Sequence, residues 1–273
     1  MAIDYIIAYD CKPKQALSTA GILERLKERE RAREVIEWFR SAGDDRPPDQ
    51  MGFEFSQSTP QTSGEKQLIV VQDLLDHAAV LDDYAETCRG CPANVTGSPY
   101  GCIGFINYPI SALAETWLLE RLPVPDEPVV WLLLRQGIRT LGYDGSSVKT
   151  LRAADGNAGG KGRTYFELPN APQRRLGELQ VDSDQILEMV FGVGDLIIPN
   201  HAGILLLFFN VIERDLEAEV IQEISSFDFA ARETVAFQMT LPTEYDACIG
   251  EFIAFFHALY TSWKLNMPLY IDA

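Results

Sequence analysis

Short stretches rich in β-branched and aromatic residues dominate the first 110 positions of the chain, and this pattern is typical of β-strands. They cover residues 3–9, 51–56, 67–72 and 104–109. Between the first two stretches, residues 18–40 carry apolar side chains at every third or fourth position. This spacing predicts one long helix, which Gly43 and the proline pair at 47–48 would end.

The rest of the chain has mainly helical periodicity. The pattern predicts helices over residues 112–121, 129–141, 183–191, 200–212, 216–224 and 245–263. Residues 267–271 are expected to form an edge strand, 165–168 a short strand, and the glycine-rich residues 143–164 a loop. The order predicts an α+β fold: N-terminal strands with a long helix and a cysteine loop, followed by a mainly helical C-terminal half.

A chain of 273 residues is long enough for one large core or two modest ones. We predict a single domain over residues 1–273. The alternative is a split at the break that contains Pro123, Pro125 and Pro128, with an α+β part over residues 1–122 and a helical part over residues 129–273.

The chain is acidic, with a formal net charge of −17, which argues against nucleic acid as a partner. The charge is uneven. Residues 149–175 carry 6 basic and 2 acidic side chains, whereas residues 176–273 carry 3 basic and 16 acidic ones. The basic stretch is expected to face water as a solvated loop, to attract a small anionic ligand, or to attract the acidic part of the chain.

We expect a cytoplasmic protein with no membrane partner. Asp4 and Asp10 interrupt the first apolar run, which therefore does not resemble a signal peptide. The longest uninterrupted apolar run in the most apolar region, residues 202–209, is too short to cross a bilayer. The expected partner is an unidentified protein or a small anionic ligand, and the expected state is a monomer or a homodimer.

Three of the five cysteines, Cys88, Cys91 and Cys102, lie in a C-x2-C-x10-C pattern within a segment rich in glycine, proline and asparagine. In a reducing compartment, clustered cysteines more often bind metals than form disulfides. Structural zinc sites use four ligands. We choose Cys11 as the fourth, because it follows the first predicted strand. The sequence thus predicts a structural zinc site that supports a binding or scaffold function.

Several alternatives to this zinc site remain open. Four thiolates also hold an iron–sulfur cluster, which would make the protein a redox or sensing component. Without a metal, Cys88 and Cys91 could form the active pair of a thiol redox enzyme. The fourth ligand could also be His77, His201 or Cys248.

The remaining motifs favour structural roles. Cys248 and His257 are nine residues apart on one predicted helix, so they point in opposite directions, and nothing supports a Cys102–His201 pair. The glycine-rich stretch around Lys161 lacks the phosphate-binding pattern. Glu213 and Glu217 have the spacing of an ordinary solvated helix face, and His201 is expected to bond to backbone. No group of residues in the sequence indicates a particular reaction, so whether the protein is an enzyme stays open.

Overall fold

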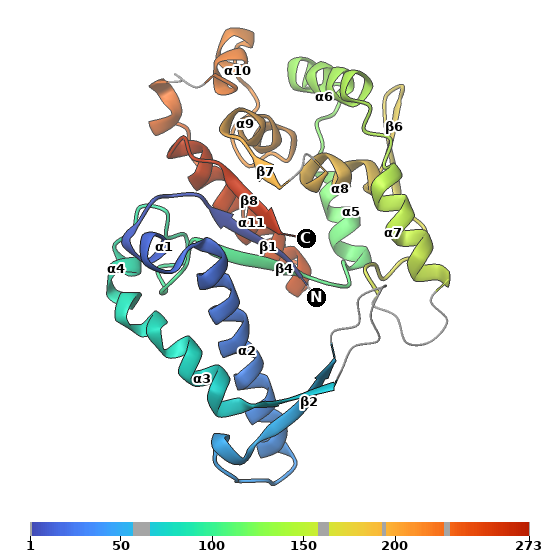
Figure 1. Ribbon diagram of the computed structural model, residues 1–273. Helices are drawn as coiled ribbons and strands as arrows, with labels where there is room; N and C mark the ends of the chain where they lie inside the picture. Colours follow the sequence, from blue (N-terminus) through green and yellow to red (C-terminus); the bar gives the residue numbers. More distant parts are fainter. Residues whose placement is uncertain (1, 57–65, 158–163, 193–194, 227–229, 273) are drawn as a thin grey trace. The chain divides into compact units, whose positions relative to one another are not determined.

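The first strand of the chain lies inside a four-stranded antiparallel sheet (Figure 1). The structure is a computed structural model that describes residues 2–56, 66–157, 164–192, 195–226 and 230–272. The strand order is β4 (Ile103–Asn107), β1 (Ala2–Ile7), β8 (Leu269–Asp272) and β7 (Leu196–Ile197). Tyr5 of β1 pairs with Gly104 on one side and with Ile271 on the other. The two ends of the chain therefore share one sheet.

Contacts divide the chain into two compact units, residues 10–101 and residues 1–9 with 102–273. The smaller unit is thus inserted between β1 and β4 of the larger one. The prediction of a single domain, with its alternative boundary at residues 123–128, stays a prediction.

The longest helix of the larger unit, α11 (Ala247–Lys264), packs against β1, β4 and β8. Asp246 caps this helix, since its carboxylate accepts a hydrogen bond from the N–H of Ile249 at 2.9 Å. Phe252, Phe255 and Phe256 are fully buried on its apolar face, and the ring of Phe255 meets that of Tyr5 edge-on at 5.2 Å. Within the described ranges, no helix combines the length and apolar character needed to cross a membrane.

The other elements of the larger unit are α5 (Ala112–Glu120), α6 (Pro128–Leu141), α7 (Ser146–Asn157), β5 (Gln173–Leu176), β6 (Leu179–Asp182), α8 (Ser183–Phe191), α9 (Pro199–Phe208), α10 (Ala218–Ile224) and the 3-10 turn η3 (Ala230–Glu233). Helix α9 packs on α11, α5 packs on α8, and α7 also packs on α8. β5 and β6 form a separate hairpin. Helices α5, α7 and α8 are therefore one connected group.

The smaller unit consists of α1 (Lys12–Leu17), α2 (Thr19–Ser41), the 3-10 turn η1 (Pro48–Gln50), β2 (Gly52–Ser56), β3 (Lys66–Val70), α3 (Val71–Ala79), the 3-10 turn η2 (Val80–Tyr84) and α4 (Ala85–Arg89). Its core forms where α2 packs on α3, around Ala32, Met51, Val71 and Leu74. Strands β2 and β3 make a two-stranded antiparallel ribbon.

The predicted α+β class, with N-terminal strands and a helical second half, is confirmed. Two local predictions were wrong. Residues 143–164 were expected to be a loop, but α7 occupies much of this region, and residues 165–168 contribute only one bridge, from Phe166 to Ile110. The hairpin β5–β6 was missed because its strands are only four residues long and carry few apolar side chains.

Gly104 is required where β4 passes the ring of Tyr5. A Cβ at Gly104 would lie 2.3 Å from the Tyr5 hydroxyl oxygen and 2.4 Å from the ring, which is buried. We expect Gly104→Ala to lower the free energy of unfolding by about 1–3 kcal/mol, the cost of overpacking a core. Urea denaturation measures this change.

Gly137→Ala is the matched control for Gly104→Ala. A Cβ at Gly137, inside α6, meets no atom within 4 Å, so alanine should stabilise the helix by about 0.5–1 kcal/mol. Equal effects of the two substitutions would contradict the packing described for Tyr5.

Candidate functional site

The cysteines predicted to bind a metal do not form a metal site. Cys11, Cys88 and Cys91 belong to the smaller unit, Cys102 belongs to the larger one, and all are free thiols. Among the described residues, no three or more His, Cys, Asp or Glu side chains are grouped to hold a metal ion. The predicted zinc site, its iron–sulfur alternative, the metal-based function and the thiol redox alternative are therefore wrong.

Hydrogen bonds, and not a metal ion, hold the cysteine loop closed. The Asn94 Nδ2 donates to the carbonyl oxygens of Cys88, at 2.8 Å, and Ser98, at 2.9 Å. Its Oδ1 accepts from the N–H of Gly97 at 2.9 Å. The Tyr100 hydroxyl donates to the carbonyl of Leu81 at 2.6 Å. The turn residues that suggested a metal loop thus satisfy one another.

Neither Cys88 nor Cys11 has the surroundings expected of a metal ligand. Cys88 is buried, and burial raises the pKa of its thiol, only partly offset by a hydrogen bond with the Tyr100 backbone. A metal ligand or nucleophile needs a thiolate, which a raised pKa disfavours. Cys11 does not end a strand, because β1 stops at Ile7, and it occupies the N-cap position of α1.

The alternative ligands have other roles. The His77 Nδ1 lies 2.5 Å from the Glu28 Oε2 across α2 and α3. The partly buried His201 contacts the carbonyl oxygen of Met189 at 3.3 Å, and burial lowers its pKa, which favours the neutral imidazole. Burial raises the pKa of the Cys248 thiol to about 11, which leaves it protonated and unreactive near neutral pH.

A cleft of about 220 Å³ in the larger unit is the better candidate site. Helix α7 supplies one wall, α8 another, and the segments after β4 and before β5 close it. The lining residues are Ile3, Tyr108, Ile110, Ser147, Val148, Leu151, Tyr165, Phe166, Leu187, Glu188, Phe191 and Gly192. Such a lining, mostly apolar with a few polar groups, is typical of small-molecule sites.

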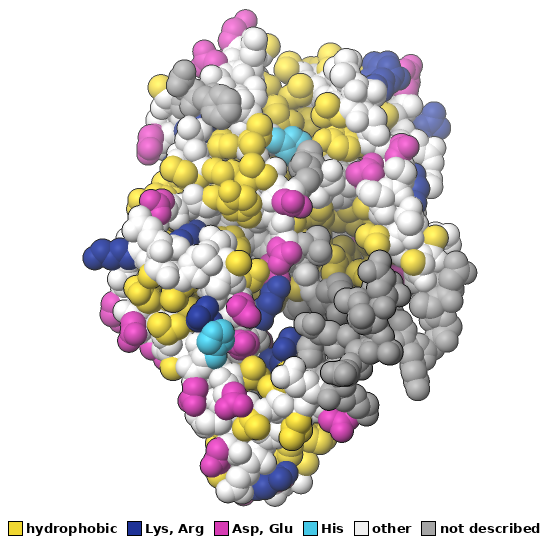
Figure 2. Space-filling model, viewed as in Figure 1, with side chains coloured by type: hydrophobic (Ala, Val, Ile, Leu, Met, Phe, Trp, Pro, Cys, Tyr) yellow, Lys and Arg dark blue, Asp and Glu magenta, His cyan; other side chains and the backbone are white. Residues whose placement is uncertain are grey.

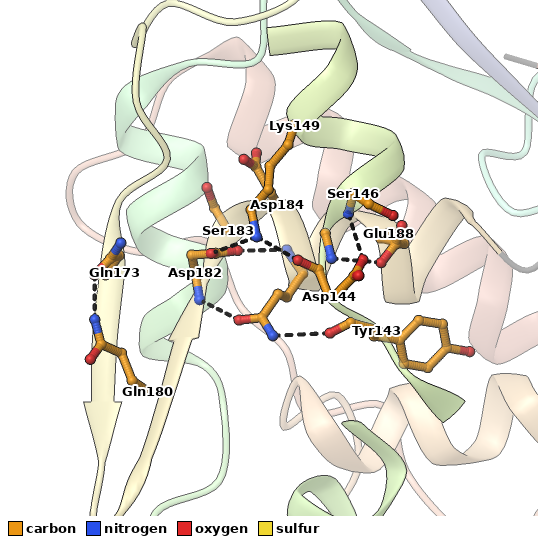
Figure 3. Close-up of polar contacts among 12 residues, drawn as sticks. Tyr143, Asp144, Ser146, Lys149, Gln173, Gln180, Asp182, Ser183, Asp184 and Glu188 are labelled. Atoms are coloured by element: carbon orange, nitrogen blue, oxygen red, sulfur yellow. Dashed lines mark hydrogen bonds and ion pairs between the residues drawn. The ribbon is translucent and has the colours of Figure 1, made fainter. Parts of the chain in front are cut away.

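Glu188 holds the start of α7 against α8 (Figure 3). One of its carboxylate oxygens accepts a hydrogen bond from the N–H of Gly145 at 2.7 Å. The other accepts from the N–H of Ser147 at 3.1 Å and from its hydroxyl at 2.6 Å. A carboxylate at this end of a helix satisfies unpaired N–H groups and interacts favourably with the helix dipole. The carboxylate group of Glu188 is therefore held in position at the cleft.

No lysine or arginine forms an ion pair with Glu188 within the part of the chain that the structure describes. The nearest charged neighbours along α7 are engaged elsewhere. Lys149 lies 3.3 Å from Asp182, and Arg152 binds Glu115 and Asp184. The cleft thus presents a carboxylate whose hydrogen bonds come only from neutral groups.

Aromatic rings also line the cleft. The rings of Tyr108 and Tyr165 meet edge-on with their centres 4.9 Å apart. The carboxylate of Asp155, near the end of α7, accepts from the N–H groups of Tyr165 at 2.6 Å and Phe166 at 3.1 Å. Burial raises the pKa of Tyr108 to about 12, with a smaller contribution from Tyr165, so its hydroxyl stays neutral. Asp155 therefore holds the backbone of Tyr165 and Phe166 in place, and the ring of Tyr108 carries no charge.

Behind the cleft, the guanidinium of Arg152 binds two buried carboxylates. It donates to Glu115 at 3.1 and 2.7 Å and to Asp184 at 2.9 and 2.7 Å. The three residues are only 4%, 0% and 2% exposed. Arg152 also lies 3.9 Å from the centre of the Phe166 ring. This network joins α5, α7 and α8, and it supports the aromatic wall from behind.

In this network two buried carboxylates share one guanidinium. Burial raises the pKa of Glu115, and hydrogen bonds from Arg152 and Ser183 lower it in part. Charged groups this deeply buried are stable only while every partner is present. We therefore regard Arg152 as a structural support for the cleft and not as a group that touches a ligand.

The described basic side chains of residues 149–175 are engaged within the chain. Besides the pairs made by Lys149 and Arg152, the Arg174 guanidinium donates to the carbonyl of Leu119 at 2.7 Å. The glycine-rich stretch around Lys161, weighed above as a phosphate loop, lies outside the described residues.

The residues of this cleft come from separate segments and carry no sequence motif that predicts a site. The stretch Asp144-Gly145-Ser146-Ser147 before Val148 and Leu151 is a helix-start signal that was available. The carboxylate that completes this start, Glu188, lies 43 residues from Gly145. Comparison of the chain with protein-family models, with curated proteins and with solved structures finds no match.

Replacing Arg152 tests the buried network. We expect Arg152→Met to lower the free energy of unfolding by about 3–5 kcal/mol, because it leaves two buried carboxylates without a cation. The cost should be smaller at pH 5 than at pH 7. Without the cation, the pKa of both carboxylates in the folded variant should rise above the value of about 4 that they have in the unfolded chain. Protonation of these carboxylates then stabilises the folded variant. This stabilisation is fully present below about pH 4 and is lost as the pH rises through the raised folded-state pKa.

Arg135→Met is the control for Arg152→Met. Arg135 lies 4.0 Å from Glu178, which is 85% exposed, and stacks on the ring of Trp131. Its loss should cost less than about 1 kcal/mol. Urea denaturation of both variants at the two pH values measures these effects, and a cost for Arg152→Met that is no larger than the control's would contradict a structural role for the network.

Proposed function

We propose that the larger unit binds a small organic amine in the cleft between α7 and α8. The observation that carries this proposal is the carboxylate of Glu188, which lines an apolar and aromatic cleft without a cationic partner among the described residues. An ammonium group would supply the missing positive charge and donate to a carboxylate oxygen.

The aromatic rings of the cleft also favour a positively charged ligand. The faces of Tyr and Phe rings carry negative partial charge and attract ammonium groups, most strongly where water is excluded. Tyr108, Tyr165 and Phe191 line the cleft together with Glu188. An amine with a compact apolar body would place its charge at Glu188 and its carbon atoms against these rings.

The volume limits the size of the ligand. A cleft of about 220 Å³ suits a molecule with on the order of ten non-hydrogen atoms, for which a Kd on the order of 1 mM is expected. The lining offers one carboxylate and the hydroxyls of serine and tyrosine, groups that bind and orient a ligand. We therefore propose a binding function, and no reaction is assigned to this cleft.

A matched pair of ligands tests this proposal. Benzylamine is a cation at neutral pH, and benzyl alcohol has nearly the same shape without the charge. We expect the full chain to bind benzylamine at least about tenfold more tightly than benzyl alcohol. Glu188→Gln should abolish this preference, because it removes the charge while keeping the shape of the side chain. Titration followed by NMR chemical shifts measures both affinities.

Asp144→Asn is the control for Glu188→Gln. Asp144 is exposed at the same end of α7, where it accepts from the N–H of Ser146 at 2.8 Å, but it does not line the cleft. Its loss should leave the preference for benzylamine unchanged. An equal affinity of the native chain for amine and alcohol, or an equal loss in both variants, would contradict the proposal.

We also propose that the protein resides in a reducing compartment, the cytoplasm. What supports this is the presence of five cysteines that are all free thiols. A thiol titration of denatured protein taken directly from cells should find five thiols per chain. A lower count that reductant restores would contradict this location.

A further inference from the structure

A second surface of the larger unit lies away from the amine cleft and has a different character. A groove of about 400 Å³ runs between α6, α9 and α10. Its apolar walls include Val129, Leu132 and Leu133 of α6, Ile204 of α9 and Ile221 of α10. Figure 2 shows hydrophobic side chains gathered between α10 and α6, with acidic side chains over α10.

Helix α6 has one apolar face that is buried in the core and further apolar side chains that are exposed. Val130, Leu134 and Ile138 recur every four residues and are buried in the core. Val129 and Leu132 lie on another face, line the groove, and are 40% and 51% exposed. A second apolar stripe on a helix is typical of a surface that a partner covers.

An ion pair and hydrogen bonds anchor both sides of the groove to the rest of the larger unit. Glu127, just before α6, forms an ion pair with Arg214 at 3.0 Å, and Arg214 also donates to the carbonyl of Leu207 at 2.7 Å. The end of α10 is held by Trp263, whose indole N–H donates to the carbonyl of Ile224 at 3.1 Å. These contacts restrict the positions of α6 and α10, which lowers the cost of ordering the groove on binding.

The charge beside the groove indicates which partner fits. Glu219 and Glu223 are exposed one turn apart on α10, next to the groove-lining Ala218 and Gln222. Residues 176–273 contain only three basic side chains. Arg214 and Arg232 are nearly buried, and Lys264 donates to the carbonyl of Glu233. The α10 side of the groove is therefore acidic.

We propose that this groove binds an amphipathic helix of another protein, with leucine-like side chains on one face and lysine or arginine along the neighbouring flank. The apolar face would cover Val129, Leu132 and Ile221, as in other helix-in-groove complexes. The basic flank would lie along Glu219 and Glu223. This inference does not depend on the function of the amine cleft.

Two synthetic peptides of about 14 residues, or about four helical turns, test the inference. Both carry leucines along one face, and the neighbouring flank is lysine in one and glutamate in the other. Fluorescence anisotropy with the full chain at about 150 mM salt, where distant surface charges are screened, measures binding. The lysine peptide should bind at least about tenfold more tightly than the glutamate peptide.

Two substitutions with the same charge change separate the groove from general attraction to an acidic protein. Leu132→Glu removes an apolar contact in the groove and should weaken binding of the lysine peptide about tenfold or more. Leu141→Glu, at the 62% exposed end of the same helix and outside the groove, should not weaken it. Thermal unfolding of both variants establishes that they fold.

The opposite results would overturn the inference. Attraction to net charge alone would leave Leu132→Glu and Leu141→Glu equal, because both add one negative charge. Absence of binding by the lysine peptide would also overturn it. A native chain that dimerises at tens of micromolar while Leu132→Glu stays monomeric would make a second copy the occupant, and the proposed partner would be wrong.

Discussion

The larger unit depends on one buried guanidinium. Arg152 ties α5, α7 and α8 together through Glu115 and Asp184, and its flat face supports the ring of Phe166. Burying an arginine and two carboxylates is costly unless each group has hydrogen-bond partners. Here the guanidinium donates to both carboxylates, and these hydrogen bonds hold the three residues together. Because these helices also form the walls of the cleft, the geometry of the cleft follows from this network. Replacing it with apolar side chains would remove a constraint on how α7 lies against α5 and α8.

The cleft and the groove have different physical origins. In the cleft, the carboxylate of Glu188 completes the start of α7 and lines the same space as the aromatic rings, so one group would serve both the structure and the proposed binding. In the groove, α6 exposes Val129 and Leu132 after its other face has filled the core. The acidic character of the chain acts on both, since it favours a cationic ligand in one and a basic helix in the other.

The sequence predicted the elements whose signals are local. The regular apolar spacing over residues 245–263 predicted α11, and the helical spacing over residues 183–191 predicted α8. The start of α7 was missed although Asp144 and the serines after it offer a local signal; Glu188, which completes this start, lies 43 residues from Gly145. The cysteine spacing suggested a metal, but spacing alone does not tell whether a thiol is buried and protonated or whether Asn94 already closes the loop. Sites built from distant segments, such as the cleft, leave little trace in local patterns.

The most direct test of the amine-binding site is a crystal structure of the full chain with benzylamine. We predict that the ammonium nitrogen lies about 3 Å from a carboxylate oxygen of Glu188, with the ring of the ligand against Tyr108, Tyr165 or Phe191. A ligand bound elsewhere, or a lysine or arginine of the chain in ion-pair contact with Glu188, would contradict the account.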